Sequence, residues 1–136
     1  MCFTKKGVVS GIIAGVLINL FALVWNLLVP GRSMWYAQAF PGMASMLGLI
    51  VTVVSFFIPG LVMGLAYDVV NKSLPWKDWK KGFAFGVGVW LLAGLMWPIM
   101  MISYAPTSIW LAEFITGFVQ YAIVGLAIEA VYKKLK

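Results

Sequence analysis

The chain has 136 residues, of which 63% are hydrophobic and only 10% charged, and its net charge is +6 with no histidine. Ordinary soluble domains contain about 25% charged residues, and a small domain leaves much of its chain in contact with water, so a water-soluble fold is excluded. The missing histidine removes the commonest general base and the commonest metal ligand. Cys2 is the only cysteine, so an intrachain disulfide is excluded as well.

The first predicted element is an apolar run over residues 7–29. It is longer than the apolar region of a signal peptide, which has about 7–15 residues, and it lacks a small-residue cleavage site. We therefore expect a retained membrane span. Cys2 precedes this run and fits either an unmodified thiol, which is the favoured interpretation, or a site of lipid attachment.

Three further runs, over residues 43–67, 82–104 and 108–128, are long enough to cross a hydrocarbon core, which takes about 20 apolar residues in a helix. Helix is expected because backbone polar groups must pair internally in lipid, and barrel strands would be far shorter. Pro59 and Pro98 each remove a backbone hydrogen bond inside a run and predict a kink. The sequence thus predicts an all-α membrane protein with four transmembrane helices, in one domain over residues 1–136.

The connections between these runs are short. The first, over residues 30–42, has Pro-Gly turn signals at both ends and room for a short interfacial helix between them. All the lysines fall on one side of the predicted spans, and Arg32 alone falls on the other. Because basic residues are enriched in cytoplasmic loops, we expect both termini in the cytoplasm and the protein in the cell's inner membrane.

The two halves of the chain resemble each other. The Lys-Lys-Gly triplet at residue 5 recurs at residue 80, and Ser-x-Trp at residue 33 recurs at residue 108. Asp68 and Glu129 follow similar Gly-Leu-Ala segments, and each stands four residues before a lysine, so local ion pairs to Lys72 and Lys133 are expected. These matches predict two parallel two-helix repeats, over residues 5–74 and 80–135, related by a pseudo-twofold axis along the membrane normal. Chance similarity between apolar helices is the alternative.

Polar side chains inside the spans are the candidates for function. At 100° per residue, Asn19 and Asn26 share one face of the first span, and Glu113, Thr116 and Gln120 share a face of the fourth. Small and polar faces pack helices together more often than they line a solute path, so packing is the favoured interpretation.

Glu113 is the only formal charge within the four predicted spans. An ionisable group inside a span marks a functional site by default, and the alternative is a structural ion pair with Arg32, the one basic residue on the outer side. The two interpretations carry equal weight. We predict that the Arg32 guanidinium approaches Glu113 within ion-pair distance and closes the outer end of the bundle.

No pattern in the chain predicts catalysis. A nucleophile–base pair and a phosphate-binding loop are both missing, and the methionines at 96, 100 and 101 fit packing better than copper binding. We therefore expect no enzyme, cofactor, metal site or nucleic-acid partner. The favoured function is a homo-oligomeric channel or carrier for a small solute, and the alternative is a non-catalytic scaffold or anchor subunit. The expected partners are the lipid bilayer and either further copies of the chain or other membrane subunits.

Overall fold

The computed structural model describes residues 4–135 of the chain, so Cys2 lies outside the described residues. Helices are the only regular secondary structure within residues 4–135. Four helical stretches are long and apolar enough to cross a membrane. They are α1 (Lys5–Leu28), α3 (Met46–Val70), an interrupted helix over Trp79–Met101, and α6 (Thr107–Lys134). These stretches coincide with the four predicted runs, with ends that differ by a few residues.

Side-chain caps mark where the first two long helices begin. The Thr4 side chain accepts a hydrogen bond from the Gly7 amide at 3.3 Å, and Ser45 accepts one from the Gly48 amide at 3.0 Å. Each cap pairs a backbone amide that has no partner within the helix.

Two short helices connect α1 to α3, namely α2 (Arg32–Ala39) and the 3-10 helix η1 (Pro41–Ala44). Gly31 precedes α2 with a φ of 78°, a left-handed conformation that glycine adopts without steric cost. The short helix expected in this connection is therefore confirmed.

The third long stretch is interrupted. It consists of α4 (Trp79–Val89), a π-helical turn η2 (Trp90–Gly94) and α5 (Met96–Met101). In the π turn the Leu95 amide donates to the Trp90 carbonyl at 2.8 Å, one residue further back than in an α-helix. Pro98 has no amide hydrogen, and its ring clashes with the carbonyl four residues earlier, that of Gly94. The distortion expected near Pro98 thus takes the form of a π turn.

Glycines bring the helices into close contact within each hairpin, α1 with α3 and α4 with α6. A Cβ atom on Gly64 would lie 2.2 Å from the backbone nitrogen of Gly11. A Cβ atom on Gly125 would lie 2.3 Å from the backbone oxygen of Gly82. Such contacts let two helix backbones approach each other directly.

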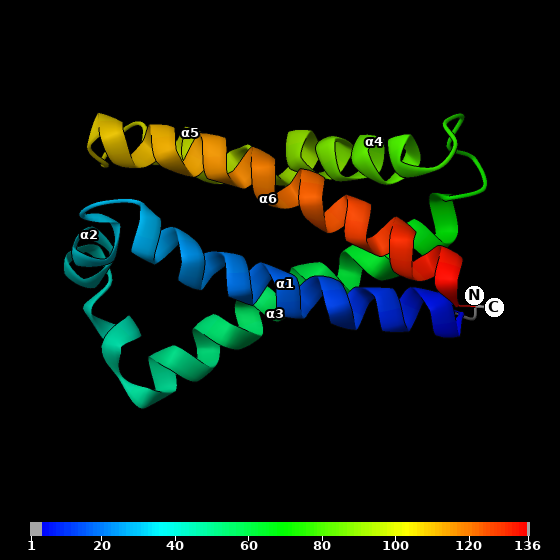
Figure 1. The fold of residues 1–136 in the computed structure, drawn as a ribbon. Coiled ribbons are helices and arrows are strands. Elements are labelled where there is room, and N and C mark those ends of the chain that lie inside the picture. The colour runs from blue at the N-terminus through cyan, green and yellow to red at the C-terminus, as the bar shows by residue number, and fades with distance from the viewer. Residues whose placement is uncertain (1–3, 136) are drawn as a thin grey trace.

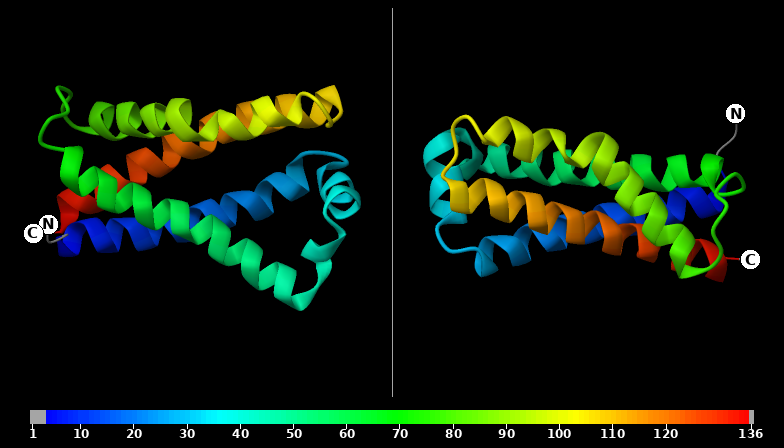
Figure 2. Two further views of the ribbon diagram at one scale, coloured as in Figure 1. Left: turned by 180° about the vertical axis from the view of Figure 1, so that it is seen from behind. Right: turned by 90° about the horizontal axis from the view of Figure 1, so that it is seen from above.

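The two hairpins meet at the end of the molecule that holds both chain termini, called the terminal end here (Figure 1). Toward the opposite end, called the α2 end, α3 diverges from α4 and α5 (Figure 2). A compact core of buried side chains, including Tyr67, Val124 and Ile128, joins the hairpins.

The packing between the hairpins is unequal. Helix α1 packs along α6, whereas α3 and α4 have little contact. A pseudo-twofold exchange of the halves would place α3 against α4 in the way that α1 lies against α6. The packing between the two hairpins therefore does not follow the expected pseudo-twofold relation, although the two helices within each hairpin pack tightly against each other.

Candidate functional site

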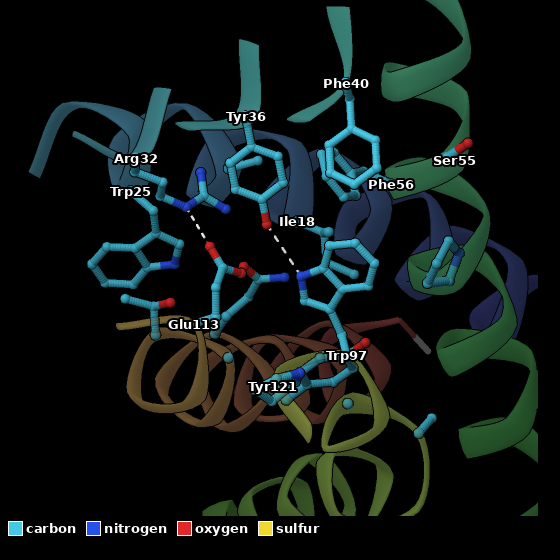
Figure 3. A pocket seen from close by; sticks show the side chains of 18 of the residues that line it. Ile18, Trp25, Arg32, Tyr36, Phe40, Ser55, Phe56, Trp97, Glu113 and Tyr121 are labelled. Atoms are coloured by element: carbon cyan, nitrogen blue, oxygen red, sulfur yellow. Dashed lines mark hydrogen bonds and ion pairs between the residues drawn. The ribbon is translucent and has the colours of Figure 1, made fainter. Parts of the chain in front are cut away.

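A cavity of about 370 Å³ lies between the hairpins in the half of the molecule nearest α2 (Figure 3). Helices α1, α2, α3, α5 and α6 and the π turn all contribute to its wall. Most of the lining is apolar or aromatic. The residues that carry polar side-chain groups are Trp25, Arg32, Tyr36, Ser55, Trp97, Glu113, Thr116, Gln120 and Tyr121. A concave, mostly apolar space with a few polar groups is the usual form of a small-molecule site.

An ion pair crosses the cavity from one hairpin to the other. The Arg32 Nε atom on α2 donates to Glu113 Oε1 on α6 at 2.5 Å, and each side chain is 10% exposed. The structure thus brings together the two residues that the sequence analysis pairs. Removing one partner of such a pair leaves an uncompensated buried charge, which costs far more than the net stabilisation the intact pair supplies.

Arg32 has two contacts besides Glu113. Its Nη1 atom donates to Asn26 Oδ1 at 2.5 Å, and its guanidinium lies 4.9 Å from the centre of the Tyr36 ring. The guanidinium is therefore held by a carboxylate, an amide and an aromatic face at once.

Tyr36 links α2 to the interrupted helix. Its hydroxyl accepts a hydrogen bond from Trp97 Nε1 at 3.1 Å. Burial, together with the nearby negative charge of Glu113, raises the pKa of Tyr36 to about 12. The phenol therefore remains protonated and neutral at physiological pH, and its hydroxyl can donate a hydrogen bond into the cavity.

The other polar residues singled out in the sequence are divided among three places. Thr116 and Gln120 line the cavity, and the Thr116 hydroxyl donates to the Ala112 carbonyl at 2.7 Å. Asn26 lines a second cavity of about 280 Å³ that shares Arg32 and Tyr36 with the first. Asn19 lines neither cavity.

The Asn19 amide instead joins two helices of one hairpin. Its Nδ2 atom donates to the Gly15 carbonyl on α1 at 3.0 Å and to the Val53 carbonyl on α3 at 3.2 Å. This residue therefore fits the packing interpretation, whereas Thr116, Gln120 and Glu113 line the cavity.

The aromatic wall of the cavity is the feature that sequence reasoning misses. It consists of six rings: Trp25, Tyr36, Phe40, Phe56, Trp97 and Tyr121. The buried Trp25 Nε1 atom has no hydrogen-bond partner among the described residues. Figure 3 shows the Trp25 ring beside the ion pair, with its nitrogen on the side of Glu113. A buried donor without an acceptor is costly, so this group is well placed to bind a polar atom in the cavity.

A second polar cluster closes the terminal end. The Tyr67 hydroxyl on α3 donates to the Glu129 carboxylate on α6, and the Tyr132 hydroxyl on α6 donates to Asp68 Oδ1 on α3 at 2.7 Å. Each hairpin thus supplies one tyrosine to a carboxylate of the other. Glu129 also forms the expected ion pair with Lys133, at 3.3 Å.

The ion pair expected between Asp68 and Lys72 is wrong. Within residues 4–135, Asp68 forms no ion pair, and its carboxylate instead accepts two hydrogen bonds from Thr4, one from the amide and one from the hydroxyl, both at 2.7 Å. The start of α1 lies beside the end of α3, and α6 brings Tyr132 to the same place, so Thr4 and Tyr132 occupy the hydrogen-bonding positions of the carboxylate.

The chain matches no known protein family, and no curated protein or solved structure is similar to it. Among the residues that the structure describes, no three metal-ligating side chains of histidine, cysteine, aspartate or glutamate come together. The arrangement of the cavity and its ion pair is thus the basis for a functional proposal.

Proposed function

We propose that the protein is an integral membrane carrier whose cavity binds a small solute from one side of the bilayer. The observation that carries this proposal is the one-sided position of the cavity. It lies between the hairpins near α2, whereas the buried core that joins the hairpins and the Tyr67–Glu129 hydrogen bond close the terminal end. A binding space that reaches one side at a time is what alternating access requires.

Exposed apolar side chains support the membrane assignment. Leu27 is 85% exposed and Leu92 is 83% exposed, and both lie on helical stretches long enough to cross a bilayer. Such surfaces are stable against lipid, which is as apolar as leucine. Since lysines concentrate at the terminal end and Arg32 lies at the other, we infer a cytoplasmic terminal end in the inner membrane.

Matching contacts in the two hairpins support an internal duplication. A Cβ atom on Gly7 would lie 2.7 Å from the Cβ of Asp68, and one on Gly82 would lie 2.7 Å from the Cβ of Glu129. These four residues occupy equivalent positions in the proposed repeats over residues 5–74 and 80–135. On this proposal the hairpins are copies, and their mutual packing has diverged.

Thiol labelling tests the one-sided cavity. In a variant with Cys2→Ala, a cysteine placed by Thr116→Cys should react with a charged, membrane-impermeant thiol reagent added outside right-side-out vesicles. The matched control is Ala14→Cys in the same background, because Ala14 is fully buried and should remain unlabelled. Labelling of Thr116→Cys only from the cytoplasmic side would contradict the proposed orientation.

Reporter fusions test the topology independently. A reporter after Gln38 should report the outside, and reporters after Leu74 and at the C-terminus should report the cytoplasm. The reverse pattern would overturn the charge argument.

A second candidate function is a scaffold subunit of a larger membrane complex. The first half of α3 favours it, because its side chains are exposed on most faces, with Met46 at 75% and Leu47 at 71%. A partner helix, or a further copy of the chain, would pack there. A purified protein whose Thr116→Cys variant is unlabelled from both sides, and which co-purifies with other membrane subunits, would favour this function.

A further inference from the structure

We propose that the cavity binds a small organic cation with an apolar body, and that the Glu113 carboxylate is its counter-ion. This inference rests on the proposed carrier function, because it names the class of solute. It follows from three features of the cavity: the aromatic wall, the unequal support of its two charges, and the position of the ion pair between two hairpins.

The aromatic wall favours positive charge. Six rings line a cavity of about 370 Å³, and apolar side chains such as Ile18 and Pro59 lie between them. The face of an aromatic ring is negative, so it attracts organic ammonium groups and repels anions. The structure already shows such a contact, since the Arg32 guanidinium lies over the Tyr36 ring.

The two buried charges are supported unequally. If Glu113 turns to a bound cation, Arg32 keeps its hydrogen bond to Asn26 and its contact with the Tyr36 ring. Asn26 lines the smaller neighbouring cavity, so Arg32 can remain on that side. An anion that takes Arg32 would instead leave the Glu113 carboxylate without its cationic partner, with only 10% of its side chain exposed. The cavity therefore tolerates an added positive charge better than an added negative one.

The position of the pair couples binding to movement. Arg32 and Glu113 belong to opposite hairpins, so their ion pair joins α2 to α6. A cation that binds Glu113 competes with Arg32 and releases this link. Binding of the solute thus frees α2 to move relative to α6, and a carrier needs such a rearrangement to change the side on which its cavity opens.

Binding of phenyltrimethylammonium tests the inference directly. The probe is radiolabelled and equilibrated by dialysis against the purified full-length protein in detergent micelles. We expect saturable binding of this cation and none of benzenesulfonate, an anion with the same aromatic body. Failure of phenyltrimethylammonium to bind would overturn the inference, whatever the variants do.

Substitutions of the two charged residues should affect the affinity differently. Glu113→Gln should weaken binding by about tenfold or more, because a desolvated charge partner is lost, and Glu113→Asp should recover part of the affinity. Arg32→Gln should leave the affinity unchanged or raise it, because the competing guanidinium is gone. A purely structural ion pair predicts that both variants weaken binding together, and that result would contradict the inference.

A matched control separates charge in the cavity from charge elsewhere. Glu129→Gln removes a buried carboxylate at the terminal end, and it should not alter phenyltrimethylammonium affinity. Size-exclusion elution of each variant verifies that it is folded. If a variant fails to fold, the comparison of phenyltrimethylammonium with benzenesulfonate on the unmodified protein still tests the inference.

The inference and the proposed function can fail separately. If benzenesulfonate or phenylalanine binds instead of the cation, and the Arg32→Gln variant no longer binds it, the cation inference is overturned. The proposed function would stand, because the cavity would still bind a solute. If no probe binds and the Thr116→Cys variant is unlabelled from both sides, the inference and the proposed function both fail.

Discussion

The two ends of the molecule are built from the same two hairpins but differ in packing. At the terminal end glycine meets glycine, and Gly64 and Gly125 each contact the backbone of a neighbouring helix. Toward the α2 end, large side chains such as Phe56 and Trp97 instead line a cavity between the hairpins. Side-chain volume, rather than hydrophobicity, thus decides where these helices touch and where space remains between them.

The largest effect is expected when a side chain is added where backbones meet. A Cβ atom on Gly64 would lie 2.2 and 2.3 Å from backbone atoms of Gly11, which cannot move aside as a flexible side chain would. We expect Gly64→Ala to lower the free energy of unfolding by about 3 kcal/mol, at the upper end of overpacking costs. Thermal unfolding in detergent micelles measures the loss.

Gly88→Ala is the matched control for this prediction. Gly88 also lies within a helix, but nothing stands within 4 Å of an added Cβ atom. Because alanine forms helix better than glycine, this variant should be neutral or more stable by up to about 1 kcal/mol. Equal behaviour of the two variants would show that the close approach of α1 and α3 adds little to the stability of the first hairpin.

The next largest effect concerns the polar cluster that closes the terminal end. Tyr67 is fully buried and its hydroxyl donates to Glu129 across the two hairpins. Tyr67→Phe removes a hydrogen bond to a charged group and should cost about 1.5–3 kcal/mol. Tyr104→Phe is the control, since the Tyr104 side chain is half exposed and should tolerate the loss of its hydroxyl. A stable Tyr67→Phe variant would mean that the apolar core, rather than this hydrogen bond, holds the two hairpins together at this end.

A smaller effect is expected at the α2 end. Trp97→Phe removes the hydrogen bond from Trp97 Nε1 to the Tyr36 hydroxyl. The Trp97 side chain is 39% exposed, so the loss should cost about 0.5 kcal/mol. The aromatic contact of residue 97 with Phe40, now at 6.4 Å between ring centres, can persist with a phenylalanine. A loss as large as that of Tyr67→Phe would mean that the two ends are equally well packed.

Much of the fold could be predicted from the sequence, because the length of an apolar run and the position of a proline act locally. The four long helices and the distortion near Pro98 follow from such signals. The arrangement of one hairpin against the other does not. It depends on many contacts between apolar faces of similar composition, and only the structure shows that α1 rather than α3 packs against the second hairpin.

The candidate site divides in the same way. The Arg32–Glu113 pair could be predicted because one buried carboxylate and one basic residue on the same side have few other partners. The aromatic wall could not, because aromatic residues are common in this chain and the tilt of the hairpins decides which of them face the cavity. Asp68 shows the same limit, because its carboxylate accepts hydrogen bonds from Thr4, a residue 64 positions away, and does not pair with Lys72, the nearest lysine in sequence.

The smallest effect is expected at an exposed ion pair beside the terminal end. Lys133 Nζ lies 2.6 Å from Asp78 Oδ1, and the two side chains are 50% and 77% exposed, so solvent screens most of their attraction. The hydrogen bond from Lys133, and then its charge, lowers the pKa of Asp78 in the folded protein. A carboxyl whose pKa is lowered by folding stabilises the protein above its unfolded pKa of about 3.9, and this contribution disappears as the pH falls through the folded pKa. Asp78→Asn should therefore melt slightly below the unmodified protein at pH 7, by less than any variant above, and the difference should vanish in acid. Asparagine has nearly the same size and shape as aspartate and would occupy the same backbone conformation, with its φ of 54°. A difference that persists at low pH would therefore come from something other than the charge.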